Sequence, residues 1–183
     1  MGSYFGMNTI AIVRSQQEIL AQCKNFILSV SPEQYKSTIK PHFISSPGKH
    51  IRHILDHYRA LKEGCVSGQV NYNRHNRNSL VETSPQAALQ LVTDMSTWLS
   101  TLSADEVLHS QICVVSEVSF TEKVHLTCDS TIVRELMFVG SHAVHHYSLI
   151  AAILSIQGYP QDDNFGLAPA TLTYQREQKT IAR

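Results

Sequence analysis

Histidines are unusually frequent in this sequence and unevenly placed: there are 10 in 183 residues, and six fall in two short stretches, His50, His53, His57, His142, His145 and His146. Residues four apart lie on one face of an α-helix. The pairs His53/His57 and His142/His146 therefore each place two imidazoles on the same side of a predicted helix. Two imidazoles at this spacing can bind one metal ion, as in H-E-x-x-H zinc helices, although the glutamate of that motif is missing here.

Nitrogen ligands of this kind suit Zn²⁺, Ni²⁺ or Fe²⁺, whereas Mg²⁺ and Ca²⁺ prefer oxygen. Val139, Leu149 and Ile153 share the helix side of His142 and His146, so we expect these two rings to face the protein interior. A buried imidazole needs partners for its nitrogens. A shared cation would satisfy two facing clusters together. The alternative is a set of separate core histidines, each bonded to backbone carbonyls or to serine and aspartate side chains.

The elements that must position these rings can be read from apolar spacing and helix caps. Apolar residues recur at helical intervals over 8–30, 47–64, 85–99 and 130–157, and Ser46-Pro47 and Ser84-Pro85 are start signals. We expect Ser31-Pro32 to end the first helix, Gly64 to end the second, and Asp129 or Ser130 to cap the last.

Between the helices, residues 67–83 are polar and predict a long loop, and β-branched residues over 111–127 predict a short β excursion. The tail after Gly158 is expected to be irregular. The chain is thus predicted to be one mainly α domain, 1–183, folded as an antiparallel four-helix bundle with the β excursion before the last helix.

Composition excludes several classes of function. Lys and Arg number 15 and so do Asp and Glu, so the chain has no basic excess for nucleic acid or an acidic membrane. The four cysteines form no C-x-x-C pair. The longest apolar run, 149–154, is too short for a bilayer, and no signal peptide is visible. We therefore expect a cytoplasmic protein that binds neither membrane nor nucleic acid.

Two segments carry a resemblance to a known family. Residues 48–58, GKHIRHILDHY, and 134–147, RELMFVGSHAVHHY, resemble the two metal-binding helices of the DinB/YfiT-like superfamily of metal-dependent enzymes, and the similarity extends over nearly the whole chain. The resemblance implies an up-down-down-up helix bundle. It also implies a divalent ion, commonly nickel or zinc, held by one histidine of the second helix and two of the fourth.

Mapped onto this chain, the implied ligands are His53, His142 and His146. His57 is the alternative on the second helix, because it lies on the same face one turn away. Asp56 and Glu135 are candidate acceptors for the free N–H of a ligand; a helix-surface position, or for Glu135 a first-turn role, is the alternative.

Three neutral imidazoles leave the ion its full charge and an open position, where water ionises near neutral pH. Hydrolysis of a small-molecule substrate is therefore the first expectation. The resemblance offers a second, transfer of a low-molecular-weight thiol bound as thiolate, and a non-catalytic metal-binding stress-response protein is a third. The loop 71–77 could bind a substrate anion through its arginines or be purely structural. A homodimer is also possible.

Overall fold

The structure is a computed structural model that describes residues 3–102, 105–159 and 161–181, so seven positions of the expected 1–183 domain lie outside the described part. It is mainly helical with a small three-stranded sheet. In chain order the elements are α1 (Ser3–Ser29), α2 (Pro32–Lys36), α3 (Pro47–Ser67), β1 (Gln69–Asn71), η1 (Leu80–Glu82), α4 (Pro85–Thr101), α5 (Asp105–Leu108), β2 (Gln111–Glu117), β3 (His125–Thr131), α6 (Ile132–Ile156) and α7 (Pro169–Ile181).

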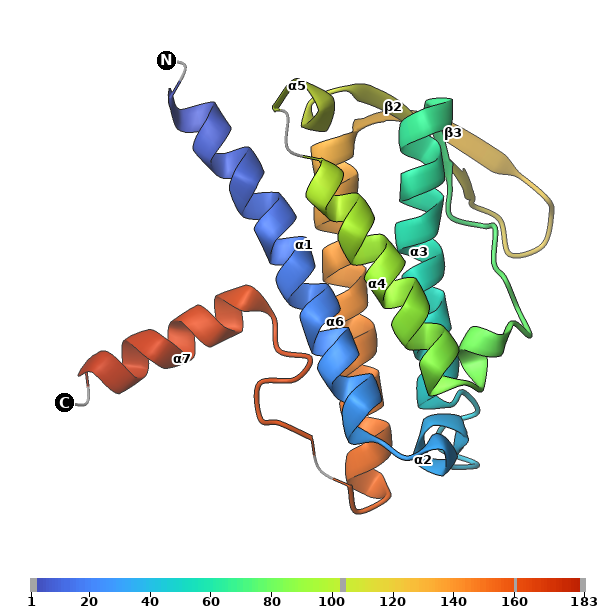
Figure 1. Cartoon of the computed structure of the whole chain (residues 1–183). Coiled ribbons are helices and arrows are strands. Elements are labelled where there is room, and N and C mark those ends of the chain that lie inside the picture. Colours follow the sequence, from blue (N-terminus) through green and yellow to red (C-terminus); the bar gives the residue numbers. More distant parts are fainter. Residues whose placement is uncertain (1–2, 103–104, 160, 182–183) are drawn as a thin grey trace.

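The long helices α1, α3, α4 and α6 lie side by side (Figure 1), with α1 and α6 running in one direction and α3 and α4 in the other. Helix α3 packs on α6, α1 on α4, and each of these pairs also contacts the other. Their apolar faces form the core, in which Leu20, Leu55, Leu99 and Ile150 are fully buried. Burial of this apolar surface is the main force that holds the helices together.

The predicted start signals are confirmed. Ser46 and Ser84 accept hydrogen bonds from the backbone N–H of Lys49 and Ala87, and a proline follows each cap. The predicted stop at Gly64 is wrong, because α3 continues to Ser67. A Cβ on Gly64 would meet the side chain of Val70, so glycine is needed there for the close approach of β1 rather than to end the helix.

The predicted start of the last helix is also wrong by one or two residues. Thr131 caps α6 and accepts from the N–H of Arg134. Asp129 and Ser130 belong instead to β3, where they pair with Cys113 and Ile112 of β2. Asp129 and Ser130 look like helix caps in the sequence, but they pair with β2 instead of capping α6.

Three short segments differ from the sequence-based expectation. Ser31-Pro32 ends α1 but also opens α2, through a capping box with Gln34. The predicted loop 67–83 contains β1 and η1, and β1 pairs in parallel with β2 at Val70↔Val114. The predicted irregular tail contains α7, which has no buried residue.

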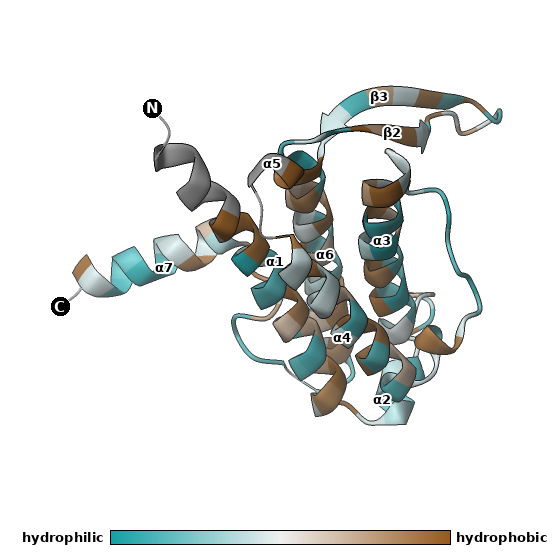
Figure 2. Cartoon of the chain, turned by 45° about the horizontal axis from the view of Figure 1, so that its top comes forward, coloured by the Kyte–Doolittle hydropathy of each residue, from teal (hydrophilic) through white to brown (hydrophobic). Residues whose placement is uncertain are grey.

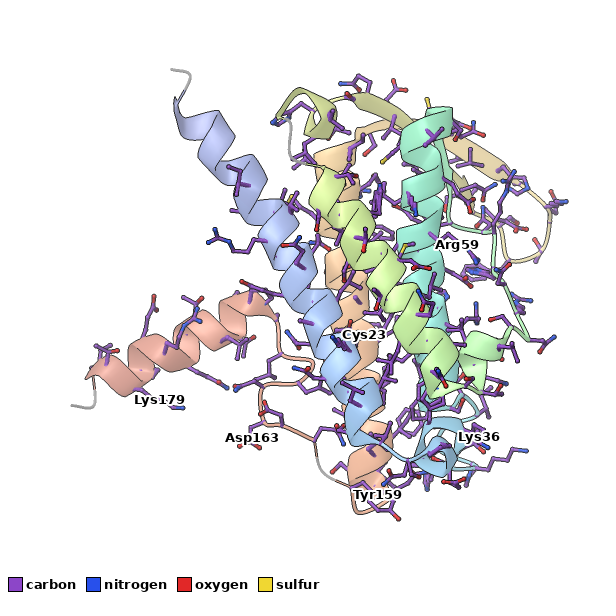
Figure 3. All side chains as sticks on the ribbon, in the orientation of Figure 1. Cys23, Lys36, Arg59, Tyr159, Asp163 and Lys179 are labelled. Atoms are coloured by element: carbon purple, nitrogen blue, oxygen red, sulfur yellow. The ribbon has the colours of Figure 1, made fainter. Side chains whose placement is uncertain are left out.

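The sheet and the last helix lie in different places around the four long helices. Figure 2 shows β2 and β3 crossing the ends of α3 and α6 while α7 projects away from the other helices. Side chains fill the space between the long helices, whereas those on α7, such as Lys179, extend outward (Figure 3). Helix α7 thus projects away from the long helices, and the side chains of the candidate site described below come from α3, α6 and the segment that follows β1.

One helix, α6, is long and apolar enough to cross a membrane when judged by length and composition alone. Core helices of soluble proteins pass the same test. Helix α6 buries Leu136, Ala143 and Ile150 against α1 and α3, which is compatible with a soluble protein.

Candidate metal centre

Histidine rings from α3 and α6 meet between these antiparallel helices. His57 faces His142, with ring centroids 4.1 Å apart, and His50 faces His146 one level further along, at 5.1 Å. His53 lies between the two levels and contacts both α6 rings, at 5.0 Å from His142 and 4.8 Å from His146. His53 is thus the central ring of the cluster, in contact with both His142 and His146.

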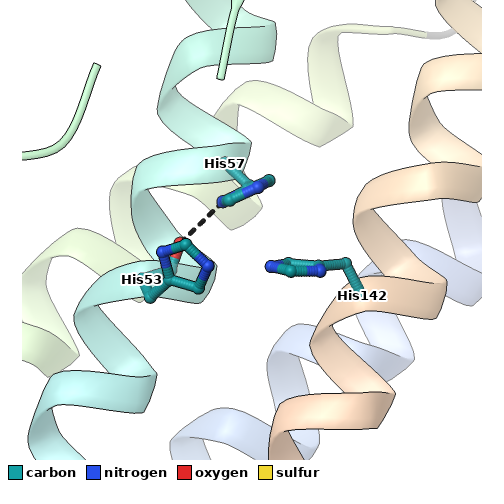
Figure 4. Close-up of side chains that lie close together, drawn as sticks. All are labelled: His53, His57 and His142. Atoms are coloured by element: carbon teal, nitrogen blue, oxygen red, sulfur yellow. Dashed lines mark hydrogen bonds between the residues drawn. The ribbon is translucent and has the colours of Figure 1, made fainter. Parts of the chain in front are cut away.

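A three-histidine group could hold a metal ion. The ring nitrogens of His53, His57 and His142 lie within 4.8 Å of one another, and Figure 4 shows the three rings converging from the two helices. Nitrogens that bind one ion sit about 2.0–2.1 Å from it, so the three nitrogens would have to move closer together to bind a shared ion.

Two of these rings have a nitrogen that makes no hydrogen bond to the protein among the described residues. The Nδ1–H of His57 donates to the backbone carbonyl of His53 at 2.9 Å, which leaves its Nε2 with a free lone pair. The Nε2 of His142 is buried and has no hydrogen-bond partner among the described residues. A buried polar atom without a partner is costly, and a cation at the centre of the group would relieve that cost. The donor set therefore fits a divalent transition metal.

The predicted ligand His146 lies at the other end of the cluster. Its Nδ1 is 2.8 Å from the Nδ1 of His50, so one of these atoms donates to the other. Its ring is 4.5 Å from that of His142. Two ligand sets therefore share His53 and His142 and differ in the third ring, which is His57 in the tightest group and His146 in the predicted one.

The rings are held in the neutral form that metal binding requires. Burial, followed by the neighbouring imidazoles, lowers the pKa of His53 to about 2, of His146 to about 3 and of His142 to about 4. Burial also lowers the pKa of His57. At neutral pH these nitrogens have lone pairs to offer.

The two carboxylates expected beside the ligands have other partners, so that interpretation is wrong. Asp56 is buried and accepts from Arg52, from Arg59 at 2.7 Å and from the backbone N–H of Asn76 at 3.0 Å. Glu135 is fully buried in the first turn of α6. It accepts from Ser130, from Tyr72 at 2.8 Å and from Arg134 at 2.6 Å.

The structure adds three residues to the site. The Tyr72 ring stacks on His57 at 5.0 Å, Phe138 stacks on His142 at 5.8 Å, and His75 packs on His53 at 5.1 Å. Phe138 is four residues before His142, so helical spacing could have found it. Tyr72 and His75 lie after β1 in a segment without periodicity, and no local signal marks them.

Other aromatic residues near the histidines belong to the core. Tyr58 and Tyr147 are buried, and their hydroxyls donate to the Gln16 side chain and to the Ile19 carbonyl, both on α1. His145 is exposed and lies beside His146, so it flanks the cluster.

The segment 71–78 is structurally anchored. The N–H of Asn73 donates to the Asn71 side chain, and the side chain of Asn73 accepts from the N–H of Glu117 on β2. These bonds favour the structural interpretation of the loop over the anion-binding one.

Comparison with known proteins gives one relative. FK506-binding protein 5 of Rhizopus delemar is 28% identical over 120 residues, which are 66% of this chain and 31% of that protein. The chain thus spans about a third of the length of the relative it matches. No family model and no solved structure matches the chain. The DinB/YfiT-like resemblance stays a prediction.

Proposed function

We propose that this chain is a metal-dependent enzyme of the DinB/YfiT-like type, with hydrolytic chemistry on a small-molecule substrate at the histidine cluster. The observation that carries the proposal is the buried, unpartnered Nε2 of His142 in a group with the ring nitrogens of His53 and His57. Nickel, zinc or ferrous iron would suit these ligands.

We also propose that the four long helices form an up-down-down-up bundle. The contacts of α3 with α6 and of α1 with α4, and the antiparallel directions within each of these pairs in Figure 1, support an up-down-down-up four-helix bundle. In this arrangement the cluster lies at the α3–α6 contact, and both helices are long enough to keep its rings rigidly placed.

When bound, the ion would act as a Lewis acid and lower the pKa of water or a thiol. The chain supplies neutral imidazoles and the aromatic rings of Tyr72 and Phe138 that pack against them. Because Asp56 and Glu135 are bonded elsewhere, the proton acceptor in a hydrolytic step would be an imidazole of the cluster.

The same engaged carboxylates favour thiol transfer as the second candidate. A thiol gives up its proton more readily than water does, so transfer of a low-molecular-weight thiol to an electrophile demands less of a base. The four cysteines are free thiols, which supports a reducing, cytoplasmic setting for either chemistry.

The test combines metal content with chemistry. We expect the purified chain to contain about one equivalent of a transition metal and His142→Ala to lose it, whereas the matched variant His145→Ala, on the exposed side of α6, keeps it. Turnover of ester or amide substrates by the loaded wild type would support hydrolysis. A change in the visible spectrum of the Co²⁺ protein on adding a thiol would support transfer. Metal binding without either result would leave a non-catalytic metal-binding protein.

A further inference from the structure

His75 is the one ring of the cluster that does not come from a helix. It lies between β1 and η1, and its ring centroid is 5.1 Å from that of His53 and 6.3 Å from that of His57. Its Nδ1 is buried and has no hydrogen-bond partner among the described residues. The ring is therefore partly enclosed by the cluster, with a nitrogen that the protein itself does not satisfy.

Buried carboxylates fix the backbone that follows this residue. The N–H of Asn76 donates to Asp56 at 3.0 Å, and that of Asn78 donates to Glu82 at 3.1 Å. Arg52 joins the two carboxylates, pairing with Asp56 and, at 2.8 Å, with Glu82. Because Arg52 and Asp56 flank His53 on α3, the network holds His75 in register with the histidines of that helix.

The ring spacings match those of ligands of a single ion. Imidazoles bound through nitrogen at about 2.1 Å have centroids roughly 4.5–5 Å apart when adjacent and about 6.4 Å apart when opposite each other. His75 is at the adjacent spacing from His53 and near the opposite spacing from His57. These two centroid spacings are compatible with one ion shared by the three rings once the His75 nitrogen turns toward it.

We propose that His75, which lies in the loop after β1, is a further ligand of the ion held by His53, His57 and His142. This rests on the proposed function, because it assumes the metal centre described above. A tetrahedral Zn²⁺ has no opposite positions, so the spacing of His57 and His75 suits an octahedral or square-planar ion such as Ni²⁺ better. As the only one of these ligands outside a helix, His75 is the one that a substrate could displace at the least structural cost.

The test uses Co²⁺ alone as the probe and the full chain after removal of metal by a chelator. Titration followed by visible absorption and calorimetry should show tight one-to-one binding by the wild type. His75→Ala should weaken binding at least about tenfold, since loss of even an outer-shell partner has that effect, and should shift the absorption bands. The matched variant His125→Ala, which removes an exposed histidine from β3, should bind as the wild type does.

Thermal melting of the metal-free variants separates a ligand from a structural residue. His75→Ala and His75→Gln should melt no lower than the wild type does without metal, because the lost Nδ1 has no hydrogen-bond partner among the described residues. If both variants melt lower, the ring has a structural role and the proposal fails. Unchanged Co²⁺ affinity and spectrum in either variant would also overturn it. Failure of the wild type to bind Co²⁺ would instead reject the metal centre as a whole.

Discussion

At the scale of single residues, the choice of third ligand separates His57 from His146. We expect His57→Ala to weaken Co²⁺ binding more than His146→Ala does. His57 belongs to the tightest group of ring nitrogens, and its Nδ1 bond to the His53 carbonyl leaves Nε2 for the ion. The Nδ1 of His146 is engaged with His50. Calorimetric titration of both variants measures the order, and the reverse order would restore His146 as the third ligand.

The sequence could predict that His53 and His142 meet, but not which ring joins them. Helical spacing places His53/His57 and His142/His146 on single faces. The third ligand depends on how far α3 is shifted along α6, and long-range packing sets that shift. His75 depends in addition on the loop bonds to Asp56, which connect residues 20 positions apart.

At the scale of elements, the buried carboxylate Asp56 should matter far more than its exposed neighbour. We expect Asp56→Asn to lower the free energy of unfolding by about 2 kcal/mol, since it removes one of the two carboxylates, Asp56 and Glu82, that compensate the largely buried Arg52. Glu63→Gln is the matched control. Glu63 also faces Arg59 but is 60% exposed, so its loss should cost less than about 1 kcal/mol. Urea unfolding measures both, and equal losses would contradict this account.

Gly140 lies on α6 where this helix packs closely on Gln16 and Ile19 of α1. Helical Gly→Ala substitutions usually stabilise by up to about 1 kcal/mol. At Gly140, however, the added Cβ would lie 2.6 Å from Nε2 of Gln16 and 3.0 Å from Ile19. We expect Gly140→Ala to destabilise by about 1–3 kcal/mol. The exposed neighbour Ser141→Ala should be nearly neutral. A higher urea midpoint for Gly140→Ala than for the wild type would contradict this prediction. It would show that Gln16 and Ile19 of α1 can move away from the added Cβ at little cost.

Local signals predicted the long helices well because caps and apolar spacing act within a few residues. Ser46 and Ser84 needed no distant partner to be recognised. β1 escaped prediction because its three residues become a strand only by pairing with β2, more than 40 positions away. Helix α7 escaped because the sequence after Gly158 has no apolar face to bury, and the structure indeed buries none of its residues.

At the scale of the whole molecule, the cluster should make the metal-free protein sensitive to acid. In the unfolded chain these imidazoles have the ordinary pKa of 6.5, whereas burial lowers the folded values to about 4 for His142, 3 for His146 and 2 for His53. Between these values the unfolded chain binds more protons than the folded one. The free energy of unfolding must therefore rise with pH in this interval. The contribution of these neutral, buried imidazoles to the free energy of unfolding is fully present above pH 6.5. It is lost progressively as the pH falls from 6.5 toward the folded pKa values.

We therefore expect the urea midpoint of the metal-free protein to fall steadily from pH 7 to pH 5. His53→Gln removes one of these titrating rings and should flatten the profile, while His125→Gln, at an exposed position on β3, should leave its slope unchanged. Saturating Zn²⁺ should raise the midpoint at pH 7 by binding the folded state. The gain should shrink toward pH 5, because protons compete for the same nitrogens. A midpoint that is flat across this range in the metal-free wild type would mean that the rings titrate normally and do not form an enclosed cluster.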